Sequence, residues 1–165
     1  MAELMAPSSE ATAYCTFRAD ERLFGIDVAW LREISTNTSI TPVPPAPPAL
    51  RGLANLRSRV HLVLDLRPLL GLPTANCTAE SRLIILKPAV AEDVGLLVDR
   101  GGDIVRVSRE QIESLDTASI SGREPSGLSK SAAADFVVGV AKLDRELMMI
   151  IDAKRLVRAI SSAMR

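Results

Sequence analysis

Three aspartates are the first candidates for chemistry, because each closes an apolar run. Asp65 ends Leu-Val-Leu-Asp, Asp99 ends Leu-Leu-Val-Asp and Asp152 ends Met-Ile-Ile-Asp. Carboxylates that meet at one edge of a sheet can form an acid cluster for catalysis. A carboxylate in such a position also accepts hydrogen bonds from the backbone N–H groups of a turn or a starting helix. The second role needs no further partner, so we expect all three to be structural caps.

The histidine and the cysteines add no recognisable metal or nucleophilic site. His61 is the single histidine and alternates with apolar residues, as a strand residue at a sheet face or edge does. Cys15 and Cys77 match no metal-ligand spacing and are expected to be reduced thiols. The sequence has no glycine-rich loop ending in Lys-Ser or Lys-Thr that would hold a phosphate. We therefore expect a protein that is not an enzyme and that binds no cofactor or metal.

The composition argues against nucleic-acid binding and membrane insertion. The 165 residues include 20 basic and 20 acidic side chains, so no positive surplus is available for a phosphate backbone. One Trp, one Tyr and three Phe are too few for a base-stacking platform. Residues 1–12 lack the positive start and apolar run of a signal peptide, and no window approaches the roughly 20 apolar residues of a membrane span. These features predict a soluble cytoplasmic protein.

The stretch 50–67 organises the rest of the chain. It leaves a proline-rich tract, passes three arginines (Arg51, Arg57 and Arg59), and becomes an apolar strand from Val60 onward. Arg51-Gly52 is interpreted as a turn. Arg57 lies between two apolar segments, so its charge must reach solvent or find a carboxylate partner.

The remaining segments predict an all-β protein with a C-terminal helix. A disordered leader at 1–13 and a mobile loop at about 116–134, rich in Ser, Ala and Gly, should flank the ordered parts. Helical turns are expected at 29–34, with Trp30, Leu31 and Ile34 facing inward, and 101–103 should be a turn. The prolines of 40–48 form a rigid connector, although such a tract can also be a ligand for an SH3-type groove. Further strands are predicted at 14–19, 23–28, 82–88, 94–99, 104–107, 136–141 and 147–152, and Leu156, Val157, Ile160 and Met164 share one face of the terminal helix. Eight to ten short strands favour two small barrels that share a core over a single barrel.

The order of these segments resembles the CheW-like family, the adaptor proteins of bacterial chemotaxis arrays. The resemblance covers 14–165, nearly the whole chain, and implies one domain made of two intertwined five-stranded SH3-like β-barrels. Each matching piece is short, and the signal lies in their order. The pieces are Phe24-Gly25-Ile26-Asp27-Val28 with Glu33-Ile34; Ile40-Thr41-Pro42-Val43-Pro44 with Ala46-Pro47; Gly52-Leu53-Ala54-Asn55-Leu56-Arg57; Val63-Leu64-Asp65-Leu66-Arg67; Gly95-Leu96-Leu97-Val98-Asp99; Gly139-Val140-Ala141; and Ile150-Ile151-Asp152.

The resemblance implies a non-enzymatic scaffold that links two partners. One is the cytoplasmic tip of methyl-accepting chemotaxis receptors, held in a groove between the barrels. The other is the regulatory domain of a CheA-type histidine kinase, which pairs with barrel ends. A cytoplasmic protein of this kind is associated with the membrane through receptor arrays. The resemblance leaves a second pathway open, in which a CheW-like adaptor serves another two-component, surface-motility or biofilm system. The competing class is an unrelated small β-barrel enzyme or nucleic-acid binder.

Four residues are candidates for the receptor side of this scaffold. Arg57 matches the arginine of the family's Asn-Leu-Arg-Gly motif, and Glu33 matches an acidic position before it, so we expect them to form an ion pair. Val43 and Leu53 flank the implied groove and are candidates for apolar contacts. The chain departs from the family pattern with Ser58 in place of the glycine and Leu62 in place of a proline. A Cβ at position 58 is unfavourable only if the backbone there has a positive φ.

Overall fold

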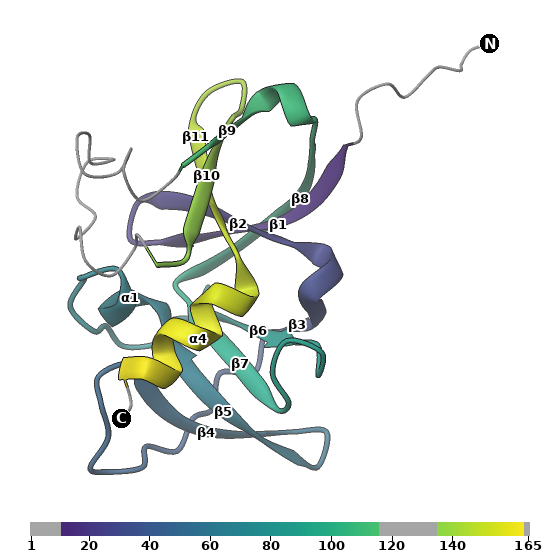
Figure 1. The fold of residues 1–165 in the computed structure, drawn as a ribbon. Helices are drawn as coiled ribbons and strands as arrows, with labels where there is room; N and C mark the ends of the chain where they lie inside the picture. The colour runs from purple at the N-terminus through teal and green to yellow at the C-terminus, as the bar shows by residue number, and fades with distance from the viewer. Residues whose placement is uncertain (1–10, 116–134, 164–165) are drawn as a thin grey trace.

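The computed structural model describes residues 11–115 and 135–163, and these form two β-sheets (Figure 1). The six-stranded sheet has the order β8-β1-β2-β11-β10-β9 and the five-stranded sheet the order β3-β6-β7-β5-β4. The first contains β1 (Thr12–Ala19), β2 (Arg22–Asp27), β8 (Arg100–Val107), β9 (Ile112–Ser114), β10 (Val137–Lys142) and β11 (Leu147–Ile151). The second contains β3 (Leu31–Ser35), β4 (Leu50–Leu56), β5 (Arg59–Asp65), β6 (Arg82–Leu86) and β7 (Val94–Val98). The helical elements are η2 (Val28–Trp30), α1 (Leu66–Leu69), η3 (Arg109–Gln111) and α4 (Ala153–Ala163).

The two sheets are interlocked by the path of the chain. The chain begins in the six-stranded sheet with β1 and β2, builds the whole five-stranded sheet, and then returns with β8 to β11. The closing strand β11 pairs in parallel with β2, and β5 pairs in parallel with β7 inside the other sheet. Helix α4 follows β11 directly. The predicted fold, all-β with a terminal helix and two SH3-like units, is confirmed, and the six-stranded sheet has one strand more than expected, the short β9.

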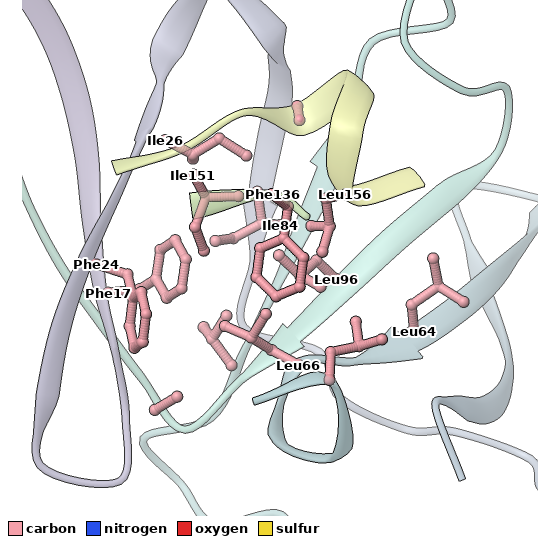
Figure 2. Close-up of a cluster of buried hydrophobic side chains, with 14 of the residues drawn as sticks. Phe17, Phe24, Ile26, Leu64, Leu66, Ile84, Leu96, Phe136, Ile151 and Leu156 are labelled. Carbon is pink, nitrogen blue, oxygen red and sulfur yellow. The ribbon is translucent and has the colours of Figure 1, made fainter. Parts of the chain in front are cut away.

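Many strands are continuous apolar runs in the sequence because apolar clusters, three in number in the described residues, pack against both of their faces. One cluster lies between the sheets and includes Phe17 and Phe24 from one sheet, Leu64 and Ile84 from the other, and Leu156 of α4 (Figure 2). Each sheet has a further cluster on its other face. Because successive side chains of a strand point to opposite faces, a strand with apolar packing on both sides has no polar alternation. In β6, for example, Leu83 and Ile85 belong to one cluster, and Ile84 and Leu86 to the shared one.

The predicted helical turns at 29–34 are wrong in most of their length. Asp27 accepts a hydrogen bond from Ala29 N–H and starts the short η2, but the chain is extended again from Leu31. Pairing with β6 then holds β3 at the sheet edge, with a bulge between Leu31 and Glu33. Ile34, expected to face inward, is 43% exposed, whereas Trp30 and Leu31 pack against the shared core.

Two predicted turns are strand segments. Gly52 lies in β4 with φ of 147°, next to a bulge, and a Cβ there would clash with the carbonyl oxygen of Thr41. Residues 101–103 belong to β8, where Gly102 packs directly on Thr16 and the Thr16 hydroxyl donates to Asp103 O over 2.7 Å. In both places glycine permits close approach of neighbouring chain rather than a reversal.

Several sequence predictions fall outside the described residues. These are the disordered leader, except that β1 already begins at Thr12, the loop at 116–134, and the position of Met164. Among the described residues, none of the helices has the length and apolar character needed to cross a membrane.

Candidate partner-binding site at the β4–β5 hairpin

The three strand-ending aspartates are caps, as expected. Asp65 accepts a hydrogen bond from Arg67 N–H at the start of α1, and Asp152 accepts one from Arg155 N–H in the first turn of α4. Asp99 accepts one from the backbone N–H of Asp20 in the β1–β2 turn. Within residues 11–115 and 135–163, no group of three or more His, Cys, Asp or Glu side chains is arranged to hold a metal ion.

The remaining reactive side chains are dispersed. Both cysteines are free thiols, with Cys15 buried and Cys77 exposed, and burial raises the pKa of the Cys15 thiol above its usual value. His61 is buried in β5, with Nδ1 3.1 Å from Arg59 O and Nε2 3.8 Å from Asp93 Oδ1. Neither the cysteines nor His61 belong to a metal-holding group among the described residues.

Arg57 lies in the turn that joins β4 to β5, and this hairpin extends to the lower right of Figure 1. Leu56 pairs with Arg59, so Arg57 and Ser58 form a two-residue turn, and their φ values are 51° and 66°. Positive φ at both positions is the pattern of a type I′ turn, which fits the twist of the flanking strands. Position 58 therefore has the backbone conformation that favours glycine, and Ser58 occupies it at a steric cost.

The expected contact between Arg57 and Glu33 is present. Arg57 Nη2 lies 3.5 Å from Glu33 Oε1, with the arginine side chain 80% exposed and the glutamate 29%. Glu33 is on β3 and Arg57 follows β4, and these two strands are the opposite edges of the five-stranded sheet. The ion pair thus joins the two edges of the sheet at the hairpin tip.

One of the two apolar candidates, Leu53, forms a short backbone bridge with the segment that leads to the other, Val43. Leu53 is half-buried in β4, and its N–H and C=O groups both bond to Thr41, over 2.9 and 2.8 Å. Val43, two residues further along from Thr41, is exposed. These two hydrogen bonds hold the proline-rich tract against the edge of β4. The tract is therefore fixed at this point, as a rigid connector is predicted to be. Whether either side chain contacts a receptor stays a prediction.

Two apolar residues near this region are exposed, although the sequence predicted that Ile34 faces inward and that Val60 opens a largely buried strand. Val60 is 57% exposed in β5, directly after Arg59, and Ile34 is exposed next to Glu33. Val60 pairs with Asn55 across the hairpin, beyond the part of the strand that meets the shared core. Because Val60 shares a strand face with core residues, the sequence pattern could not show that it is exposed. Val60 differs from those residues only in its place near the hairpin tip.

A second ion pair was also missed. The guanidinium of Arg59 binds the carboxylate of Asp93 through two hydrogen bonds, from Nε over 2.9 Å and from Nη2 over 2.8 Å. The hydrogen bond from Arg59 holds the pKa of the Asp93 carboxyl below its usual value. Because 34 residues separate the partners, no local spacing could have indicated the contact.

Comparisons with known proteins agree with this architecture. Residues 13–161 match the family model described as CheW-like domain. A chemotaxis protein CheW of Bacillus subtilis is 32% identical over 137 residues, covering 83% of this chain and 81% of that protein. A chemotaxis protein CheW of Treponema pallidum is 24% identical over 155 residues, covering 92% and 85%. The crystal structure of the scaffolding protein TtCheW from Thermoanaerobacter tengcongensis matches with a TM-score of 0.70 and 26% identity, over 86% of this chain and 89% of that one. With nearly all of its length matched, the chain belongs to the CheW-like domain family.

Proposed function

We propose that the protein is a non-enzymatic adaptor that couples transmembrane chemoreceptors to a CheA-type histidine kinase, with the β4–β5 tip on the receptor side. The observation that carries the proposal is the placement of Arg57, exposed at a rigid sheet edge and paired with Glu33 across it. Relatives described as chemotaxis protein CheW and as a scaffolding protein support the adaptor role.

The chemistry of the tip suits a protein partner. A mostly exposed guanidinium with one 3.5 Å contact keeps most of its donors available for carboxylates or backbone carbonyls. Arginine beside apolar side chains is a common centre of protein–protein binding energy. Ile34, next to Glu33, and Val60, next to Arg59, supply exposed apolar surface beside the paired charges of this region. We infer that a receptor hairpin contacts this surface and that the kinase regulatory domain binds elsewhere, at barrel ends.

In this proposal the protein acts in the cytoplasm and is brought to the membrane by the receptors it binds. Its contribution is geometric, because a scaffold needs a stiff frame more than it needs reactive groups. The shared core, with stacked Phe17 and Phe24 rings 5.8 Å apart, supplies such a frame between the two sheets.

Two calorimetric titrations test the proposal. The protein, as wild type and as Arg57→Ala, is titrated with the regulatory domain of the CheA-type kinase and separately with a receptor cytoplasmic-tip fragment. We expect Arg57→Ala to lose about tenfold or more in receptor affinity, the equivalent of about 1.4 kcal/mol, and to keep its kinase affinity. Arg106→Ala, at an exposed arginine of β8, is the matched control and should bind both partners normally.

Two results would overturn the assignment. Wild-type receptor affinity in a folded Arg57→Ala variant would remove the tip from the receptor side. A folded wild type that binds neither partner would reject the coupling function, and binding to the kinase of a surface-motility or biofilm system instead would identify the alternative pathway.

A further inference from the structure

The contact with Glu33 does not by itself orient Arg57. The two atoms are 3.5 Å apart, and most of the arginine side chain is in solvent. Exposed ion pairs of this kind contribute little because solvent screens them and long side chains lose entropy when held. The direction of Arg57 therefore depends mainly on the backbone of the turn that carries it.

The turn is restrained through its next residue, Arg59. Its guanidinium makes the two-bond contact with Asp93, a geometry that fixes both orientation and distance. Its carbonyl oxygen lies 3.1 Å from Nδ1 of the buried His61. Side chain and backbone of Arg59 are thus both held, immediately after the two residues with positive φ.

Asp93 is itself anchored on the neighbouring strand. Its carbonyl oxygen accepts the Leu62 N–H over 2.8 Å, one residue before β7 begins its parallel pairing with β5. Its φ is 53°, a conformation that non-glycine residues adopt rarely and that aspartate and asparagine tolerate best. Strained backbone of this kind persists where the surrounding contacts determine it. Here it lets one residue bond β5 with its backbone and the hairpin tip with its side chain.

We propose that Asp93 is a positioning residue for Arg57: by clamping Arg59 it fixes the hairpin turn that presents Arg57 to the receptor. This inference rests on the proposed receptor role of Arg57. The tip is then held from both sides, by β3 through Glu33 and by the β6–β7 connection through Asp93. Loss of Asp93 leaves Arg57 chemically intact but free to sample many directions, so binding must then overcome the entropy of ordering it.

A double-mutant cycle tests whether Asp93 acts through Arg57. Receptor-tip affinity is measured for wild type, Asp93→Asn, Arg57→Ala and the double variant. Asparagine is chosen because it accepts positive φ and nearly keeps the shape of aspartate. We expect Asp93→Asn to weaken receptor binding about three- to tenfold and to cost nothing more once Arg57 is alanine, since coupled residues are not additive. Kinase affinity should stay at the wild-type value in all four proteins.

Glu92→Gln is the matched control, because it removes the same charge from the adjacent, exposed residue. It should bind receptor as the wild type does. Wild-type affinity in Asp93→Asn, equal weakening by Glu92→Gln, or additive losses in the cycle would each overturn the positioning role.

A second measurement separates this inference from the proposed function. Amide hydrogen exchange at residues 57–59 of the free protein reports on the turn without any receptor. If Arg57→Ala binds the receptor normally, the proposed receptor contact of Arg57 is rejected. Hydrogen exchange then still tests whether Asp93 holds the turn that carries Arg57. Faster exchange there in Asp93→Asn, but not in Glu92→Gln, supports the clamp; unchanged exchange overturns it.

Discussion

The two ends of the β4–β5 hairpin have the same chemistry in different surroundings. At the base, Arg51 Nη1 lies 2.7 Å from Asp65 Oδ2, and the side chains are 22% and 2% exposed. At the tip, Arg57 and Glu33 are 3.5 Å apart, and 80% and 29% exposed. A buried charge that loses its partner is strongly destabilising, whereas an exposed pair contributes little to stability. The paired charges at the base therefore stabilise the fold, whereas those at the tip are accessible to a partner.

The base is also the more connected end. Arg51 donates a further hydrogen bond to Ala75 O, and Arg67, which follows the hairpin, donates to Pro73 O. Arg67 additionally pairs with Asp99, whose carboxylate accepts the backbone N–H of Asp20. Two arginines therefore tie the 73–75 loop to the hairpin base and the base to the other sheet. At the tip, the structure gives the Arg57 side chain only the 3.5 Å contact with Glu33, and the two-bond contact there is made by its neighbour Arg59 with Asp93.

The largest expected effect follows from breaking the base. Asp65→Ala leaves Arg51 half-buried without its carboxylate and removes the cap of α1, so the free energy of unfolding should fall by about 3–5 kcal/mol. Urea denaturation measures this loss. Asp65→Asn, which keeps an oxygen to accept the Arg67 N–H, should lose less. Equal stability of both variants and the wild type would contradict the assignment of the base to the fold.

A smaller effect of opposite sign is expected at the tip. Ser58→Gly should raise the free energy of unfolding by about 1 kcal/mol, because it removes the steric cost of a left-handed residue. Ser58→Ala keeps the Cβ and should show no such gain. The same denaturation experiment checks both, and a destabilised Ser58→Gly would mean that the added chain entropy of glycine outweighs the relieved strain.

The sequence predicted most of what depends on local pattern. Continuous apolar runs such as 83–86 indicated strands buried on both faces, and the strand count indicated two units with a shared core. A charge between apolar segments indicated that Arg57 needs solvent or a carboxylate, and the structure provides both. The family resemblance, not the spacing, identified Glu33 as that carboxylate.

What the sequence did not predict depends on contacts between distant segments. The sequence predicts helical turns where β3 lies, because a short apolar pattern of this kind suits a helix or a strand, and pairing with β6 makes it a strand. β4 was missed because Gly52 suggested a turn, although the glycine is needed for close approach to Thr41. Asp93 gave no signal at all, since its importance arises only where its loop meets Arg59.

Arg57 is expected to matter little for stability, in contrast to the buried charges of the hairpin base. Arg57→Ala should change the free energy of unfolding by less than about 1 kcal/mol, since an exposed pair with an 80% exposed partner is screened by solvent. A thermal or urea unfolding curve that superimposes on the wild type would show that lost receptor binding reflects the surface. A loss as large as that of Asp65→Ala would show that the tip, too, belongs to the fold.

The smallest effect is a pH dependence at the tip. Bonding to Arg59 lowers the pKa of the Asp93 carboxyl, so this group binds a proton less readily in the folded protein than in the unfolded chain, where aspartates titrate at about pH 3.9. The stabilising contribution is therefore fully present above that pH and is lost as the pH falls through the lower, folded pKa. The stability difference between wild type and Asp93→Asn should be constant from about pH 5 to 7 and shrink below about pH 4. A difference that persists unchanged into acid would mean that the carboxylate charge is not what joins the β6–β7 connection to the tip.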